Sequence, residues 1–347
     1  MRADVSLTTK PERQAARLRR QAGGIVGALV GLLAFAGFLA GAAAYFGWRE
    51  ASRPGPLADE KIVMIEQGAS VGAMADQLQR EGAIRSALVF KAAARARRQD
   101  GALKAGEYEI PIGASTLDVL DLLVSGKSVL HTLTIPEGLT TAQILRLAAS
   151  APKLTGEISL EPAEGALLPE TYAFTRGESR DAIVSRMADA QTELLDALWE
   201  GRATELPYTT RREAIILASI VEKETGAADE RRRVAAVFVN RLKRGMRLES
   251  DPTIIYGLTG GEPLGRGIRE SELRKETPYN TYRVAGLPPT PIANPGREAI
   301  EAVLDPMQTE ELFFVADGNG GHAFAETLQE HNANVAKWRR IERERQP

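Results

Sequence analysis

Residues 211–225 read RREAIILASIVEKET, and this stretch decides how the second half of the chain folds. Its apolar side chains recur at helical spacing, which places Ile220 and Val221 on one face. Glu224 falls on that same face, whereas Glu222 points to a flank. The stretch therefore predicts an amphipathic helix that ends with one carboxylate on its apolar side.

A carboxylate in this position is suited to acid catalysis. Partial burial disfavours the charged form of a carboxyl group and so raises its pKa. A side chain that donates a proton near neutral pH needs such an environment. Glu224 is therefore the candidate catalytic residue, although an ion pair with Arg241 or with one of residues 231–233 would explain the same pattern.

The segment that follows supplies further polar candidates. A second helix is predicted over residues 229–245, where Asn240 lies beside the apolar stripe. It could bind a substrate amide or serve packing within the fold. Ser250, Asp251 and Pro252 combine an N-cap with a proline in the first helical turn, which predicts another helix start.

Two segments near the C-terminus also carry candidate binding residues. TPYNTY at 277–282 suits carbohydrate, because rings stack on sugar faces and amides bind acetamido groups, but it equally suits turns. Residues 312–324 predict a hairpin, in which His322 is a site residue or an edge residue. A helix is predicted over residues 328–343. The candidate substrate-binding residues are Asn240, Asp251, Tyr279, Asn280, Tyr282 and His322.

A strand, a glycine turn and a capped helix recur three times between residues 61 and 150. Ser70, Ser115 and Thr140 stand at the N-cap position of the three helices. With a second helical stretch after the first unit, residues 61–110 predict the order β-α-α-β. This order and size resemble the LysM module, a small fold that binds glycans containing N-acetylglucosamine. The alternative is a packing or spacer subdomain.

The N-terminal region predicts a membrane anchor. No charged residue occurs between Arg20 and Arg49, and this apolar stretch is long enough to cross a bilayer. Six basic and two acidic residues precede it, a net +4, which favours a cytoplasmic N-terminus. A cleaved signal peptide is the alternative, but its apolar core would be shorter. The expected organisation is a cytoplasmic tail (1–20), a transmembrane anchor (21–48), a linker (49–60), a LysM-like strand–helix subdomain (61–150) and a mixed α+β catalytic domain (151–347).

Composition excludes several classes of protein. The 347 residues carry a net charge of −2, which argues against a general nucleic-acid binder. The chain has no cysteine, which excludes disulfides, thiolate metal sites and a cysteine nucleophile. Its three histidines form no metal-binding motif, so we expect neither a metal nor another cofactor.

The chain resembles the YceG-like family in six segments that occur in the same order. The similarity covers about residues 60–340, and residues 259–270 depart from the family pattern. The segments are LASIVEKET (217–225), RVAAVFVNRL (233–242), GMRLESDPTIIYG (245–257), TPYNTY (277–282), GLPPTPIANPG (286–296) and FFVADGNGGHAF (313–324).

Characterised members of the YceG-like family are endolytic murein transglycosylases. The resemblance therefore implies an enzyme that cleaves nascent peptidoglycan strands, leaves 1,6-anhydro-N-acetylmuramic acid ends and terminates elongation. It implies a single-pass protein of the inner membrane with a periplasmic catalytic domain, and peptidoglycan synthases as partners. The family's catalytic glutamate is the second Glu of E-K-E-T, which is Glu224 here.

Two other functions stay open at this point. A non-catalytic, membrane-tethered scaffold that binds peptidoglycan would explain the anchor and the LysM-like module, but not Glu224 on an apolar face. A glycan hydrolase would need a second carboxylate, for which the chain offers Glu222, Asp229, Glu230 and Asp251.

Overall fold

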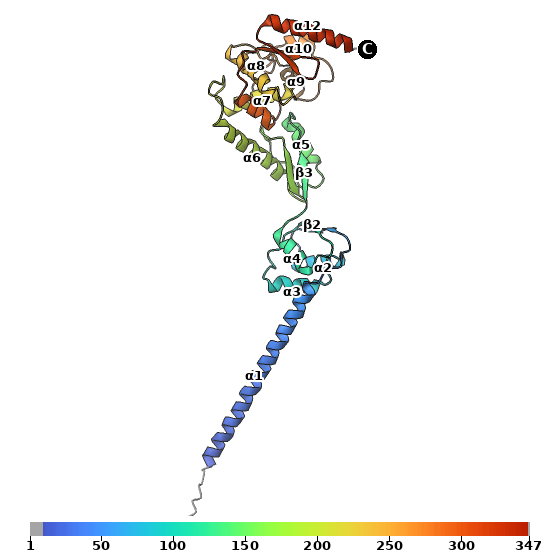
Figure 1. Ribbon diagram of the computed structural model, residues 1–347, viewed down its shortest axis with the longest axis vertical. Helices are drawn as coiled ribbons and strands as arrows, with labels where there is room; N and C mark the ends of the chain where they lie inside the picture. The colour runs from blue at the N-terminus through green and yellow to red at the C-terminus, as the bar shows by residue number, and fades with distance from the viewer. Residues whose placement is uncertain (1–9, 346–347) are drawn as a thin grey trace, which may run out of the picture. The chain divides into compact units, whose positions relative to one another are not determined.

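The structure, a computed structural model, describes residues 10–345, with the side chains of residues 29–345. The chain divides into two compact units, one that ends at Val129 and one that begins at Leu130 (Figure 1). Each unit combines helices with two-stranded antiparallel sheets, which confirms the predicted α+β class. The predicted cytoplasmic tail lies partly outside the described residues, because they begin at Lys10.

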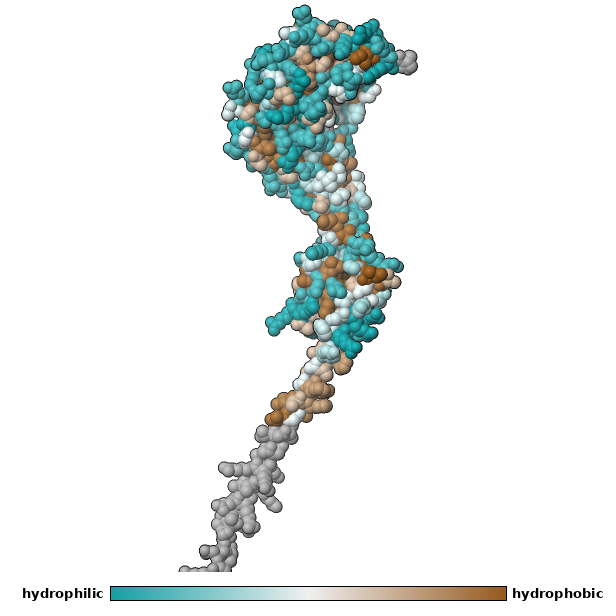
Figure 2. Space-filling view, in the orientation of Figure 1, coloured by the Kyte–Doolittle hydropathy of each residue, from teal (hydrophilic) through white to brown (hydrophobic). Residues whose placement is uncertain are grey.

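Helix α1, Lys10–Ala51, contains the apolar N-terminal stretch. Its span Leu29–Ala51 has a mean hydropathy of 2.0, and its side chains are largely exposed, as the brown surface in Figure 2 shows. At about 1.5 Å per residue, its 23 residues reach about 34 Å, enough to cross the hydrocarbon core of a bilayer. The helix is therefore compatible with a single-pass membrane anchor.

The predicted β-α-α-β order is confirmed in the N-terminal unit. Strands β1, Lys61–Ile65, and β2, Gly106–Ile110, pair antiparallel and enclose α2, Val71–Arg80, and α3, Ala87–Ala96. Helix α4, Thr116–Ser125, follows β2. The hydroxyls at the predicted N-caps accept hydrogen bonds from the first helical turn, and the core between these elements is apolar. Its largest fully buried side chains are Ile65, Leu78, Ile84, Phe90, Tyr108, Ile110, Leu120 and Leu123.

The third strand–helix repeat belongs to the C-terminal unit. Strand β3, Leu130–Thr134, pairs antiparallel with β4, Thr171–Thr175. Helix α5, Thr141–Ser150, packs against α6, Arg180–Trp199. The compact units divide after residue 129, because β3 pairs with β4 beyond α5, whereas the predicted strand–helix subdomain extends to residue 150.

Helix α7, Arg211–Glu224, lies at the centre of the C-terminal unit. It packs against α8, Arg231–Lys243, and α11, Arg297–Leu304, which pack against each other. The short helices α9, Asp251–Thr259, and α10, Glu270–Arg274, occupy the segment between α8 and α11. The two long helices predicted here are confirmed with slightly shorter bounds. Fully buried core residues include Leu217, Ile220, Val221, Val234, Val237, Ile300 and Val303.

The predicted C-terminal hairpin and final helix are also confirmed. Strands β5, Phe313–Ala316, and β6, His322–Ala325, pair antiparallel, and α12, Leu328–Arg345, packs on them. Asp317 closes the turn, since its Oδ1 accepts a hydrogen bond from the N–H of Asn319 at 2.6 Å. The hairpin places His322 at the start of β6, where it faces the segment between α7 and α8 through Glu230.

Candidate active site

Glu224 is the last residue of α7. The helix begins with a capping box in which the Thr210 hydroxyl and the Glu213 carboxylate each accept a hydrogen bond from the other residue's N–H. Ile220 and Val221, on the same face as Glu224, are fully buried. The Glu224 carboxyl group therefore leaves the core at the helix end, where it is partly buried.

The Glu224 carboxyl group has one strong hydrogen-bond donor in an otherwise desolvated environment. The Ser250 hydroxyl donates to Glu224 Oε1 at 2.5 Å. Burial raises the pKa of Glu224 to about 7, and the negative charge of Asp251 adds to this rise. The Ser250 hydrogen bond and the charges of His322 and Arg241 oppose it. Near pH 7 the group thus divides between acid and carboxylate, as a general acid–base needs.

The arginines that could neutralise Glu224 pair with other carboxylates. Among the residues that the structure describes, no ion pair includes Glu224. The alternative of a structural ion pair is therefore not realised, and the carboxyl group stays free to exchange a proton. The observed pairs are Arg231–Glu298, Arg232–Asp305, Arg233–Glu311 and Arg241–Glu249.

A second chain segment holds Ser250 in place and adds a tyrosine. The N–H of Ser250 donates to the Thr281 hydroxyl at 2.9 Å. The Tyr282 hydroxyl donates to Asp251 Oδ1 at 2.8 Å. Burial raises the pKa of Tyr282, which keeps its hydroxyl protonated and able to donate. Two of the predicted binding residues, Asp251 and Tyr282, thus lie beside the candidate catalytic residue Glu224.

His322 reaches the same site from strand β6. Glu230 accepts a hydrogen bond from the N–H of His322 at 2.9 Å and contacts its ring Nδ1 at 2.7 Å. These two contacts fix the backbone and the ring together, so Nε2 is left for other partners. The positive charge of a protonated His322 ring is one of the influences that oppose the rise in the pKa of Glu224.

Two predicted binding residues are engaged within the fold instead. The Asn240 amide donates to the carbonyls of Thr309 and Glu311, at 2.8 and 3.0 Å. Asn280 is buried, and its amide donates to three carbonyls in the segment 272–275. In the described part of the chain neither amide contacts the candidate catalytic carboxyl group. The buried amide of Asn280 needs such partners, and the partly buried amide of Asn240 makes the same kind of contact with a loop.

A groove lies next to α9, and its lining includes the sequence neighbours of Glu224 and Asp251. Lys223, Pro252 and Tyr256 help to line a cavity of about 300 Å³. Tyr279 supports the wall of this groove, since its ring lies 5.1 Å from that of Tyr256 between centroids. Its hydroxyl shares a hydrogen bond of 2.7 Å with the Thr290 hydroxyl. The predicted residue Tyr279 therefore contacts Tyr256 and Thr290, and no contact of Tyr279 with Glu224 occurs in the described part of the chain.

Glu222, the other carboxylate near the end of α7, serves a neighbouring helix. Its Oε2 accepts a hydrogen bond from the N–H of Gly296 at 3.0 Å. Gly296 is the N-cap of α11, where a negative charge is favourable. Burial raises the pKa of Glu222 as well. Its hydrogen bond is nevertheless made with α11 and not with Ser250.

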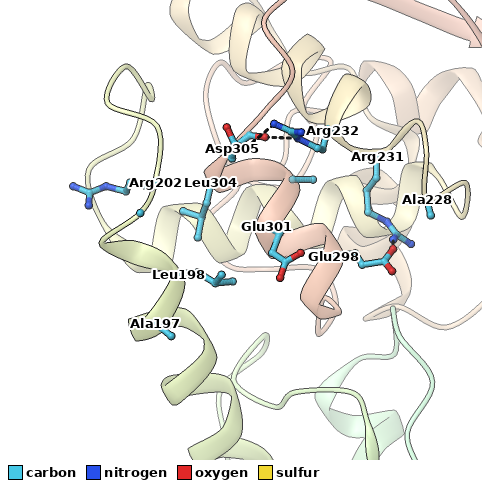
Figure 3. A pocket seen from close by; sticks show the side chains of 12 residues that line it. Ala197, Leu198, Arg202, Ala228, Arg231, Arg232, Glu298, Glu301, Leu304 and Asp305 are labelled. Carbon is cyan, nitrogen blue, oxygen red and sulfur yellow. Dashed lines mark hydrogen bonds and ion pairs between the residues drawn. The ribbon is translucent and has the colours of Figure 1, made fainter.

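A larger cavity between α6, α8 and α11 lies elsewhere in the unit (Figure 3). Its volume is about 640 Å³, and the residues that line it do not include Glu224. Arg232 pairs there with Asp305 at 2.6 Å, and Arg231 pairs with Glu298. Four of the six charged lining residues are paired within this cavity, and we assign the candidate site to Glu224, whose pKa is raised. Within residues 10–345, no cluster of three potential metal ligands is present.

Two residues that complete the site were not singled out from the sequence. Ser250 is predicted there only as an N-cap, yet its hydroxyl makes no capping bond. Pro252 has no N–H, so one of the donors that an N-cap hydroxyl would bind is missing. This proline is the feature of the sequence that indicates a different partner for the Ser250 hydroxyl. Glu230 is predicted only as one of several rival acids, but it orients His322.

The fold and the site together define an α+β protein whose candidate catalytic group is Glu224, a glutamic acid with a raised pKa. The chain belongs to the YceG-like family, whose profile matches residues 63–337.

Relatives and a solved structure align with most of the chain. The endolytic murein transglycosylase of Bacillus subtilis (strain 168) is 28% identical over 307 residues, which are 80% of this chain and 84% of that protein. The endolytic murein transglycosylase of Streptococcus pneumoniae serotype 2 is 29% identical over 361 residues, covering 88% of this chain and 64% of that protein. A 2.6 Å crystal structure of a YceG-like protein from Listeria monocytogenes is 29% identical and covers 79% of this chain and 98% of that chain, with a TM-score of 0.48.

Proposed function

We propose that this protein is a lytic transglycosylase that cleaves peptidoglycan glycan strands endolytically. The observation that carries the proposal is the partly buried Glu224 with its single donor Ser250 at 2.5 Å. Relatives named endolytic murein transglycosylases share its family, which supports the same substrate and the same cut within the strand.

One carboxyl group can perform both proton transfers of this reaction. In its acid form Glu224 protonates the glycosidic oxygen while the bond to the anomeric carbon of the muramyl residue breaks. The resulting carboxylate then takes the proton of the C6 hydroxyl of the same residue, whose oxygen bonds to the anomeric carbon. The product carries a 1,6-anhydro end, no water is consumed, and Glu224 is protonated again. The substrate's acetamido group stabilises the anomeric centre where glycosidases use a second carboxylate.

The residues around Glu224 support this double role. The Ser250 hydroxyl stabilises the carboxylate that forms after the first step and fixes its orientation. Asp251 and Tyr282 form a polar pair beside it, and His322 presents its free ring nitrogen. We assign the substrate contacts to these three residues.

The same proposal includes the place of the protein in the cell. The net +4 in front of the apolar span favours a cytoplasmic N-terminus, an inner-membrane anchor and a periplasmic catalytic unit. The β-α-α-β module binds glycan in the manner of LysM, and synthases that elongate peptidoglycan are the partners. No metal or other cofactor takes part in this mechanism.

Mass spectrometry of digested glycan strands tests the reaction. A lytic transglycosylase conserves the summed mass of the strand, whereas a hydrolase adds one water for each cut. We expect anhydro ends from the unmodified protein and about 10²–10⁴-fold slower formation of them by Glu224→Gln. Reducing ends would reassign the protein as a hydrolase, and uncut strands that still bind would favour the non-catalytic scaffold.

A further inference from the structure

An apolar cavity lies beside the last turns of α1. Its volume is about 460 Å³, and it is formed by α1, α3 and the first turn of α4. Trp48 and Ala51 line it from α1, Leu88 lines it from α3, and Leu117 lines it from α4. Among these lining residues only Arg97 is charged. The cavity is therefore suited to an apolar occupant.

The position of the cavity relates it to a bilayer. Trp48 and Ala51 belong to the end of the apolar span Leu29–Ala51. Helix α1 packs against α3 within one compact unit, so α3 stays close to the end of that span. Tryptophan is enriched where membrane spans meet water. If α1 crosses a membrane, α3 lies at the membrane surface.

The exposed side of α3 has the composition of a membrane-binding surface. The Leu88 side chain is 74% exposed, although its burial would be favourable. Residues 87–98 contain four basic and no acidic residues, of which Lys91 pairs with Asp76 and Arg97 with Asp121. Arg95 is exposed, and its nearest ion-pair partner, Asp100, is 3.8 Å away. An apolar patch with a basic rim matches a bilayer that contains anionic lipids.

We propose that the end of α1 and the exposed side of α3 dock on the membrane surface, with an acyl chain of an anionic phospholipid in the cavity. A second copy of the chain fits this surface less well, because its exposed Arg95 and Arg98 would face those of the first copy. Docking fixes the β-α-α-β module against the bilayer. The proposal uses no property of Glu224, so it is independent of the reaction.

The absence of cysteine makes spin labelling a direct test, because one introduced cysteine is the only labelled site. We would label Leu88→Cys and, as a matched control, Ile62→Cys in the full chain reconstituted into vesicles that contain phosphatidylglycerol. Ile62 is also an exposed apolar residue, 54% exposed, but lies on strand β1. We expect the Leu88 label to collide with oxygen, which concentrates in the bilayer, and the Ile62 label with a water-soluble nickel chelate.

The charged rim has its own readout. The double substitution Arg95→Gln and Arg98→Gln would be made in the chain labelled at Leu88→Cys. It should lower the ratio of membrane-bound to water-exposed labels about 30-fold. Vesicles of phosphatidylcholine should have a similar effect on the unmodified rim. Equal access of the nickel chelate to both labels would overturn the proposal, and spin–spin broadening between Leu88 labels would assign the surface to a second copy.

Discussion

The two compact units bury different kinds of side chain. Among described residues, the buried polar side chains of the N-terminal unit are Glu107, Ser115 and Thr116. The C-terminal unit buries many more, and most of them bond to distant parts of the chain. They include Gln191, Ser219, Arg231, Arg241, Ser250, Thr253, Asn280, Thr281, Asn294 and Glu311. The first unit is thus stabilised by helix caps and apolar packing. The second depends in addition on buried polar contacts, some of which also form the candidate site.

Arg241 shows how these polar contacts work. Its guanidinium group donates to the carbonyl of Leu312 at 2.7 Å and to that of Leu248 at 2.9 Å. It thereby joins α8 to the hairpin that carries His322 and to the segment that carries Ser250. In the N-terminal unit, Arg97 at the end of α3 pairs with Asp121 of α4 at 2.7 Å, but this pair is exposed to solvent.

The largest expected effect separates the two carboxylates of α7. Glu224→Gln keeps the size of the side chain but removes the acidic proton, so the rate of strand cleavage should fall about 10²–10⁴-fold. Glu222→Gln should retain most activity, because Glu222 bonds to Gly296. The measurement is the release of fragments by both purified variants, with melting curves as a control for folding. An inactive Glu222 variant beside an active Glu224 variant would reverse the assignment.

The next effect compares a buried arginine with an exposed one. Arg241→Met leaves buried carbonyls and Glu249 without their donor and should destabilise the C-terminal unit by about 3–5 kcal/mol. Arg97→Met in the N-terminal unit should cost about 0.5 kcal/mol or less. Thermal melting followed by tryptophan fluorescence compares the two variants. Similar costs for both would contradict the contrast between the units.

A third effect concerns stability and pH. Because the pKa of Glu224 is raised to about 7, the folded protein holds its proton where the unfolded chain releases it. Its contribution to stability is therefore complete below pH 4.5 and is lost as pH rises to 7. Glu224→Gln should then stabilise the unit by about 3 kcal/mol above pH 7 and by almost nothing at pH 4.5. Melting curves at both pH values test this, and a gain at low pH alone would refute the sign.

Two neighbours should move the pH profile of catalysis in opposite directions. Activity should fall above pH 7, because Glu224 must begin each cycle protonated. Ser250→Ala removes a hydrogen bond to the carboxylate, which raises the pKa and shifts this fall upward by about one pH unit. Asp251→Asn removes a negative charge and shifts it downward. The measurement is the pH dependence of kcat/KM for both variants. As a control, Glu222→Gln should leave the pH dependence of the unmodified protein unchanged.

The smallest effect tests the local character of the N-terminal unit. Ser115 and Asp118 form a capping box at the start of α4, with hydrogen bonds of 2.8 and 3.2 Å. Ser115→Ala should cost about 1 kcal/mol of stability in that unit. Strand cleavage by the C-terminal unit should not change, because the box lies wholly within the first unit. A lost activity would show that the units depend on each other.

The sequence predicted what local rules determine. Caps at Ser70, Ser115 and Thr140, the β-α-α-β order and the position of Glu224 all follow from spacing within one or two elements. The sequence did not predict the pairing of β3 with β4. These strands are far apart in the chain, and no local pattern indicates which strand pairs with which.

The missed site residues have the same cause. Ser250 bonds to a carboxylate 26 positions earlier, and Glu230 holds a histidine 92 positions later. The polarity of Asn240 and Asn280 suits substrate binding, but the amide N–H groups of each donate to carbonyls that only folding brings near. The polarity of a side chain in the sequence does not distinguish an amide that bonds within the fold from one that is exposed to a substrate.

The short connection between α7 and α8 limits how this sequence can diverge. Glu224 ends one helix, and Glu230, which orients His322, immediately precedes the next. An insertion into residues 225–229 would separate the acid from the group that fixes its histidine neighbour. Insertions into residues 260–269, between α9 and α10, would move neither of them. Evolution in this lineage should therefore vary the length of the second connection and hold that of the first constant.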